Sequence, residues 1–201
     1  MKERKANIYL GLVHGPVKNK YGKEVTTSVT NLDVHDIARS CRTFGFKGYF
    51  IITPVWAQHD LLGKMLGYWE SDSANLYNPD RHDALKLIKL VNTIEESVCA
   101  IREREEGRDV LVAVTGANFQ EDDGLVEAHE LMEAVAEANG RPLLLLFGTG
   151  HGLVSSIVES ADYRLTPIVG LAEDGYNHLS VRSAVAIYCE RLACAQRNSD
   201  K

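Results

Sequence analysis

The sequence lacks the features of a membrane protein, a secreted protein or a metal enzyme. Its apolar runs fall short of the roughly 20 residues that a membrane helix needs, and no cleavage-site pattern follows residues 1–5. The four cysteines are scattered without a C-x-x-C pair, which argues against zinc fingers and a disulfide framework. The seven histidines form no H-x-x-x-H or H-E-x-x-H arrangement. We therefore expect a soluble, cytoplasmic protein without a bound metal.

Three common nucleotide and hydrolase motifs are also missing. No Gly-Lys-Ser/Thr is present, which excludes a phosphate-binding loop of the P-loop type. The glycines at 148–152 come late in the chain and lack the G-x-G-x-x-G spacing of a dinucleotide-binding turn. The absence of G-x-S-x-G argues against a serine hydrolase with this nucleophile motif.

Positive charge is scarce but concentrated. The 28 acidic residues outnumber the 22 lysines and arginines, and the net charge is −6. Residues 1–50 nevertheless hold nine basic and four acidic residues, a net of +5. Because screening makes nearby charges count more than distant ones, a locally basic face on an acidic protein can still hold phosphates.

Apolar strands and amphipathic helices alternate along the chain. Continuous apolar runs predict buried strands over 7–13, 48–53, 109–114, 143–147 and near 163–165. Helical spacing and capping residues predict helices over 33–44, 56–66, 79–101, 125–138, 153–160 and 179–196. This alternation predicts an α/β fold, a mainly parallel sheet with helices on both faces, within a single domain over 1–201.

Glycine-bearing loops follow three of the predicted strands. The apolar run 143–147 is followed by three glycines within five positions, which bare the backbone at the start of a helix. Loop 165–170 follows a second strand and precedes the polar cluster 176–184 that opens the last helix, and 115–117 ends a third strand. Ligands of open α/β sheets bind beyond the carboxyl ends of strands. The loops are therefore expected to enclose one ligand of about the size of adenine.

Two of these segments resemble the cofactor motifs of a known family. Phe-Gly-Thr-Gly-His-Gly-Leu at 147–153 and Tyr-Asn-His-Leu-Ser-Val-Arg-Ser-Ala at 176–184 are together similar to the two cofactor motifs of the SPOUT superfamily, the α/β-knot RNA methyltransferases. The resemblance implies S-adenosylmethionine as cofactor, a C-terminal trefoil knot that holds it, and a homodimer whose active sites draw on both chains. It is weak over 55–106, where the sequence leaves room for a helical insertion. The cofactor-binding candidates are Thr115, Gly116, Ala117, Phe147, Gly148, Thr149, Gly150, Gly152, Pro167, Ile168, Gly170, Asn177, His178, Leu179 and Val181.

The first predicted helix resembles another SPOUT motif, N-x-G-x-x-x-R-x-x-x-x-F-G, from the branch that methylates ribose hydroxyls. Its arginine aligns with Arg39, and its last two residues align with Phe44 and Gly45. The match is partial, because Asp33 and His35 replace the asparagine and the first glycine. Arg39 is the candidate for holding substrate phosphate or the reacting group, and the alternative is a plain surface arginine.

Proton removal and RNA binding would need residues near Arg39. The base candidate is Asp36, with His35 and Asp33 as alternatives. The candidates for contacting RNA phosphates are Lys18, Lys20, Lys23 and Arg42, although the basic loop 14–24 could equally be a solvated surface.

The resemblance thus implies an S-adenosylmethionine-dependent RNA methyltransferase acting on tRNA, at a guanine base or a ribose. The alternative is a non-catalytic knotted protein that binds S-adenosylmethionine or RNA and has lost its base.

Overall fold

The computed structural model describes residues 7–69, 76, 78–120 and 124–199. Their main feature is a seven-stranded sheet in the order β5-β4-β1-β8-β6-β9-β7, in which each neighbouring pair is parallel. The strands are β1 (Ile8–Val13), β4 (Gly48–Ile52), β5 (Ile88–Val91), β6 (Leu111–Val114), β7 (Leu125–Val126), β8 (Leu143–Gly148) and β9 (Tyr163–Leu165). The predicted parallel α/β sheet is confirmed.

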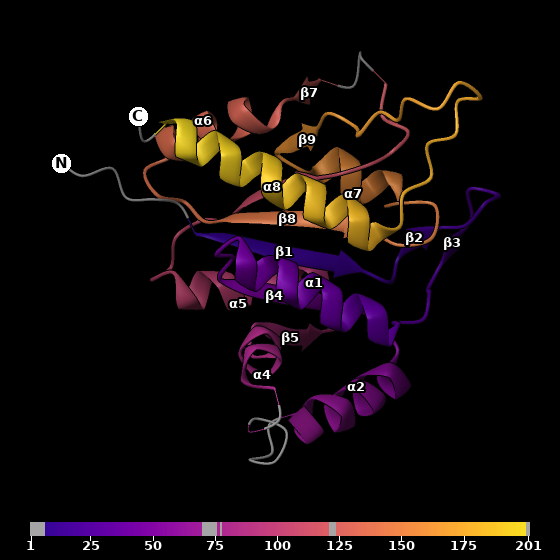
Figure 1. Ribbon diagram of the computed structural model, residues 1–201, viewed down its shortest axis with the longest axis vertical. Helices are drawn as coiled ribbons and strands as arrows, with labels where there is room; N and C mark the ends of the chain where they lie inside the picture. The colour runs from indigo at the N-terminus through magenta and orange to yellow at the C-terminus, as the bar shows by residue number, and fades with distance from the viewer. Residues whose placement is uncertain (1–6, 70–75, 77, 121–123, 200–201) are drawn as a thin grey trace.

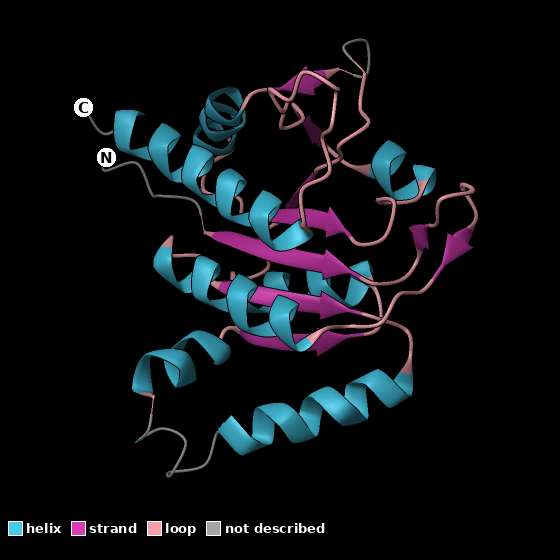
Figure 2. Ribbon diagram, turned by 45° about the vertical axis from the view of Figure 1, so that its right-hand side comes forward, coloured by secondary structure: helices cyan, strands magenta, loops and turns pink. Residues whose placement is uncertain are grey.

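Helices cover both faces of the sheet (Figure 1). One face packs against α1 (Asn31–Thr43), α4 (Pro79–Leu85), α6 (Ala128–Glu137) and α8 (Val181–Ser199). The other face packs against α5 (Ile94–Arg104) and α7 (Ser155–Ser160). Helix α2 (Trp56–Trp69) lies beyond the β5 edge, away from the middle of the sheet (Figure 2). In the described part of the chain, no helix is long and apolar enough to span a membrane.

The centre of the sheet is formed by β1 and β8, which lie side by side although 129 residues separate them in sequence. Side chains of β1 alternate between the two faces, so Leu10 contacts the α1 and α8 layer whereas Tyr9 contacts the α5 layer. All six β1 residues are buried, as expected for a strand covered on both faces.

Helix α1 forms where its capping residues predict it. The Thr30 side chain accepts a hydrogen bond from the Asp33 backbone, and Gly45 follows the helix with a φ of +76°. Its buried residues include Val34, Ile37 and Cys41, which lie on one stripe.

The predicted helix over 79–101 is wrong. Helix α4 ends at Leu85, strand β5 follows as an edge of the sheet, and α5 begins after Thr93. Apolar residues continue at helical spacing through β5, which hides the break. The signal for the break was Thr93, whose side chain accepts from the Glu96 backbone as an N-cap. Within the segment at about 55–106, strand β5 therefore belongs to the main sheet, and helix α5 packs against that sheet.

Two smaller segments also differ from the prediction. Loop 14–24 contains an antiparallel hairpin, formed by β2 (Val17–Lys18) and β3 (Glu24–Val25). Strand β7 takes the first residues of the predicted helix 125–138, because it extends the sheet beside β9. Both changes add backbone pairing to segments that have too few apolar residues to signal a strand.

Candidate functional site

A cavity of about 580 Å³ lies at the carboxyl ends of β6 and β8. Its wall is formed by residues of the glycine loop after β8, the loop after β6, the start of α8 and the segment that leads into α1. Thirteen of the predicted cofactor residues line it: Thr115, Gly116, Ala117, Phe147, Gly148, Thr149, Gly150, Gly152, Ile168, Asn177, His178, Leu179 and Val181. Its volume lies within the roughly 300–1,000 Å³ of small-molecule sites.

The glycine loop is shaped by two positions that exclude larger residues. A Cβ on Gly148 would lie 2.5 Å from the Leu153 backbone nitrogen, and Gly150 has a φ of +61°. The loop packs against β2, because His151 N donates to Lys18 O at 2.9 Å and Lys18 N donates to Gly152 O at 2.8 Å. The hairpin thus holds the loop in place.

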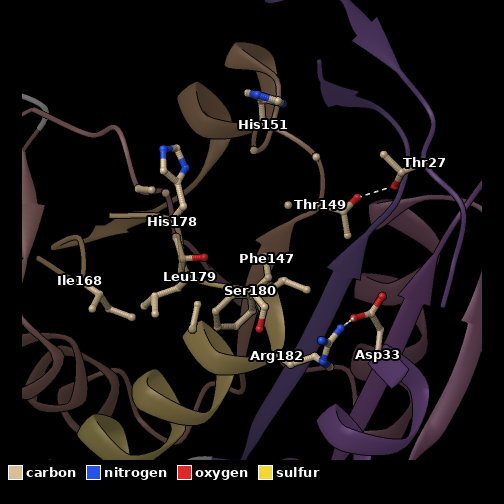
Figure 3. A pocket seen from close by; sticks show the side chains of 18 of the residues that line it. Thr27, Asp33, Phe147, Thr149, His151, Ile168, His178, Leu179, Ser180 and Arg182 are labelled. Atoms are coloured by element: carbon tan, nitrogen blue, oxygen red, sulfur yellow. Dashed lines mark hydrogen bonds and ion pairs between the residues drawn. The ribbon is translucent and has the colours of Figure 1, made fainter. Parts of the chain in front are cut away.

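The cavity has an apolar side and a polar side (Figure 3). Ile168 and Leu179 lie on the apolar side, with Phe147 at the base. Thr27 and Thr149 lie on the polar side, where their hydroxyl oxygens are 2.6 Å apart. Such a cavity suits a ligand with a flat apolar ring and a polar tail.

An ion pair between Arg182 and Asp33 forms part of the polar wall of the cavity. Arg182 Nη1 is 3.0 Å from Asp33 Oδ1, and Arg182 Nε is 3.5 Å from Asp36 Oδ2. The Thr30 hydroxyl donates to Asp33 Oδ2 at 2.6 Å. Of the described residues that line the cavity, Asp33 is the one carboxylate and Arg182 the one guanidinium.

A buried histidine stands behind the polar side. His14 Nδ1 is 3.1 Å from Thr27 Oγ1, and Thr149 Oγ1 donates to Val13 O at 3.0 Å. Burial lowers the pKa of His14 to about 4, so the imidazole is neutral at pH 7. A neutral ring fixes the Thr27 hydroxyl without adding charge to the cavity.

The sequence matches a family model over residues 7–194, described as SAM-dependent RNA methyltransferase. The chain belongs to this family. The prediction of an S-adenosylmethionine-dependent RNA methyltransferase is confirmed at the level of the family.

Two relatives show how far the likeness extends. A protein from Oleidesulfovibrio alaskensis named tRNA (guanine-N(1)-)-methyltransferase is 44% identical over 92% of this chain, but the match spans only 42% of that relative. An uncharacterized protein from Aquifex aeolicus is 35% identical over 95% of this chain and 90% of its own length. The chain therefore spans less than half of the longer, named relative.

A solved structure shows the same fold. The SpoU methyltransferase AviRb from Streptomyces viridochromogenes, solved in complex with AdoMet, superposes with a TM-score of 0.56. It is 16% identical, and the match covers 98% of this chain and 60% of that one. This likeness concerns the fold.

The cavity fits the methyltransferase family's cofactor, S-adenosylmethionine. The apolar side can hold the adenine between Ile168, Leu179 and Val181, and the glycine loop offers backbone groups to polar atoms. A Cβ on Gly150 would lie 3.0 Å from Lys18 O, which shows how closely the loop packs at this wall. The threonine hydroxyls and the Arg182 guanidinium would be the polar partners for the amino acid part of the cofactor.

Two predicted cofactor residues and the predicted catalytic pair lie outside the cavity wall. Pro167 and Gly170 flank the wall residue Ile168 in its loop. Arg39 is exposed on α1, and Asp36 reaches only the outer side of Arg182. Their roles stay predictions.

The predicted RNA-binding residues divide into three groups. Lys18 is half-buried on β2, whereas Lys20 and Lys23 are exposed beside it in the hairpin. Arg42 is on the last turn of α1 and pairs with Asp83 at 2.5 Å.

Several wall residues were not predicted. His151, Ser180, Arg182 and Ala184 lie within the two quoted motifs, so motif membership was the available signal. Asp33 was named only as an alternative base. The remaining unpredicted wall residues are Thr27, Ser28, Thr30, Asn118 and Tyr188. No group of three or more possible metal ligands was found among the described residues.

Proposed function

We propose that this chain transfers a methyl group from S-adenosylmethionine to tRNA. The observation that carries the proposal is the Asp33 carboxylate on the wall of a cavity shaped for the cofactor. The name of the O. alaskensis relative supports tRNA as the RNA class. Four free thiols agree with a reducing compartment such as the cytoplasm.

Asp33 is the group that can receive the proton lost by the acceptor. When bound, the cofactor supplies an electrophilic methyl group on a sulfonium. The Asp33 carboxylate would take the proton that the acceptor nitrogen or oxygen loses on receiving this methyl group, and the cofactor would leave as its neutral thioether, S-adenosylhomocysteine. Arg182 and Thr30 each engage one oxygen of Asp33, and a carboxylate has further lone pairs to accept the proton.

The acceptor atom is a guanine nitrogen or a ribose hydroxyl. The name of the O. alaskensis relative favours guanine N1, but more than half of that relative lies outside the match. The partial motif around Arg39 favours a ribose hydroxyl. Both acceptors lose one proton, so the proposed role of Asp33 is the same for either.

The purified chain, incubated with tritiated-methyl S-adenosylmethionine and total tRNA, should label the tRNA. Digestion to nucleosides then separates 1-methylguanosine from 2′-O-methyl nucleosides. Isothermal titration with S-adenosylmethionine is measured in parallel. Cofactor binding without label on the tRNA would favour the non-catalytic alternative.

We infer a homodimer from the resemblance, and a trefoil knot remains part of the same inference. The sequence offers an apolar stripe on α8 for a two-fold contact, formed by Val181, Ala184, Val185, Ile187, Tyr188 and Leu192. This stripe is partly used within the chain, because Val185, Tyr188 and Leu192 are buried in its own core. The loop before α8 offers exposed apolar residues instead, including Leu171, which is 99% exposed, and Tyr176. Sedimentation equilibrium at micromolar concentration should show a dimer, and Leu171→Asp should weaken it.

A further inference from the structure

A second cavity of about 540 Å³ adjoins the cofactor cavity. The two cavities share the loop 115–118 and the residues His151 and Gly152 as a common wall. The opposite walls of the second cavity come from β2, α7 and β9, which supply Lys18, Ser155 and Arg164.

Both cations in the second cavity are held by rigid elements. The Lys18 backbone bonds to the glycine loop through its nitrogen and its oxygen, and its Nζ donates to Ser155 Oγ at 3.1 Å. Arg164 belongs to β9, which pairs with both β6 and β7, and its Nε donates to Val158 O at 3.2 Å. The two cations are half-buried and placed before any ligand arrives, which lowers the entropy cost of binding.

The charges of the second cavity favour an anion. Over the described residues that line it, Lys18 and Arg164 face one carboxylate, Glu159, with His151 at the shared wall. A guanidinium can hold two phosphate oxygens at once, and an ammonium adds a point charge. Partial burial strengthens both interactions relative to open solvent.

The surroundings indicate an extended polyanion rather than a small free anion. Lys20 and Lys23 follow Lys18 in the β2–β3 hairpin, whose one carboxylate, Glu24, pairs with Lys18 across the strands, so the hairpin stays net positive outside the cavity. In the other direction, the cofactor cavity lies on the far side of the shared wall. A strand bound along this path would place one phosphate beside the cofactor site.

We propose that the second cavity binds a backbone phosphodiester of the substrate RNA, next to the nucleotide that is methylated. Lys18 and Arg164 hold the phosphate oxygens, and the phosphate fixes the position of the acceptor across the shared wall. This proposal rests on the proposed function, since it assumes an RNA substrate.

The test compares charge-removing variants of the whole chain. Lys18→Gln and Arg164→Gln should each lower tRNA affinity about tenfold in filter binding. Each should also reduce the slope of log affinity against log salt by about 0.7 to 0.9, which is one phosphate contact. The affinity for S-adenosylmethionine, measured by titration, should stay within twofold. Lys47→Gln, an equal charge change on an exposed residue just before β4, is the matched control and should change neither quantity.

Two further variants guard against a folding defect. Arg164→Lys and Lys18→Arg keep the charge, so they should retain the parental salt slope even where affinity falls slightly. Equal losses in Lys47→Gln and the two cavity variants would overturn the proposal, as would unchanged RNA affinity in both cavity variants. If inorganic phosphate competes as well per phosphate as a short RNA, the cavity binds free anions and the RNA assignment is wrong.

The binding test is separate from methyl transfer. If the cavity variants lose RNA affinity while no RNA becomes labelled, this proposal stands and the proposed activity fails. If tRNA is methylated by both variants with parental affinity, the activity stands and the phosphate site is wrong.

Discussion

Arg182 in the first turn of α8 donates to Asp33 in the first turn of α1 across 149 residues of sequence, with 3.0 Å between Nη1 and Oδ1. The Asp33 side chain is only 6% exposed and that of Arg182 is 31% exposed. The pair therefore joins the two helices at the cavity and keeps a carboxylate there beside a fixed positive charge. Asp36, one turn further along α1, contacts the same arginine from the solvent side.

This arrangement predicts that Asp33, and not Asp36, is the base. Asp33→Asn should lower methyl transfer by a hundredfold or more, about 2.7 kcal/mol, while the affinity for S-adenosylmethionine stays within threefold. Asp36→Asn keeps the cavity wall intact and should cost less than tenfold. Single-turnover transfer to tRNA measures both, and a larger loss in Asp36→Asn would reverse the assignment.

Gly150 should not tolerate a side chain, for two reasons: the Lys18 carbonyl oxygen lies close to it, and its own φ is positive. Gly150→Ala places a Cβ 3.0 Å from Lys18 O at a φ of +61°, so the loop must move away from β2. We expect cofactor affinity to fall at least tenfold, on the order of 1.4 kcal/mol. Titration calorimetry provides the measurement.

Gly107→Ala is the matched control for Gly150→Ala. Gly107 has a φ of +81°, but a Cβ there would meet nothing within 4 Å, and it follows α5 away from the cavity wall. This variant should lose stability through backbone strain and keep its cofactor affinity. An equal loss of affinity in the two variants would mean that general destabilisation, rather than the loop, explains the result.

The lowered pKa of His14 predicts that the free energy of unfolding falls in mild acid. Its folded pKa of about 4 is below its ordinary value of 6.5, so between these values the unfolded chain binds more protons. The stability that His14 contributes is present above pH 6.5 and is lost as the pH falls toward 4. Between pH 7 and pH 5 the loss should be about 2 kcal/mol.

Urea denaturation at pH 7 and pH 5 tests the role of His14. His14→Asn can keep a hydrogen bond to Thr27 and removes the titrating ring, so its stability should depend less on pH. Both proteins contain the same carboxylates, and those contributions cancel in the comparison. Identical pH dependence in the two proteins would assign the acid sensitivity to other groups.

The sequence predicted the parts of the site that are local in the chain. Uninterrupted apolar residues predict buried strands such as β8, and the glycine loop follows β8 directly in the sequence. Strand β5 was missed because its apolar residues continue the spacing of the helices on either side. A four-residue edge strand is defined by its pairing with β4, which is a long-range contact.

The choice among Asp33, Asp36 and Arg39 also depends on long-range packing. Positions 33 and 36 are neighbours on the α1 surface, since they are three residues apart. The packing of α8 against α1 decides which of Asp33 and Asp36 is buried. The sequence of α1 alone does not predict where α8 packs. The same holds for Thr27, which reaches the cavity because the β2–β3 hairpin turns the chain back toward the glycine loop.

The last prediction concerns Arg39, which is exposed on α1 and outside the cavity wall of its own chain. In the proposed homodimer, an exposed arginine can serve the cavity of the partner. Arg39→Ala should then leave cofactor affinity within threefold, below about 0.7 kcal/mol, and lower methyl transfer a hundredfold or more, about 2.7 kcal/mol. Arg39→Lys should recover little, because an ammonium cannot hold phosphate in a bidentate way.

Mixing two inactive chains tests whether Arg39 acts across the dimer. An Arg39→Ala chain still has Asp33, and an Asp33→Asn chain still has Arg39, so a mixed dimer contains one complete site if the two residues come from different protomers. Random pairing makes half of the dimers mixed, with one working site in two, and should restore about a quarter of the parental rate. No recovery after subunit exchange would place Arg39 in the site of its own chain. Parental transfer by Arg39→Ala alone would make it an ordinary surface residue, and the partial motif around it would then have no functional meaning.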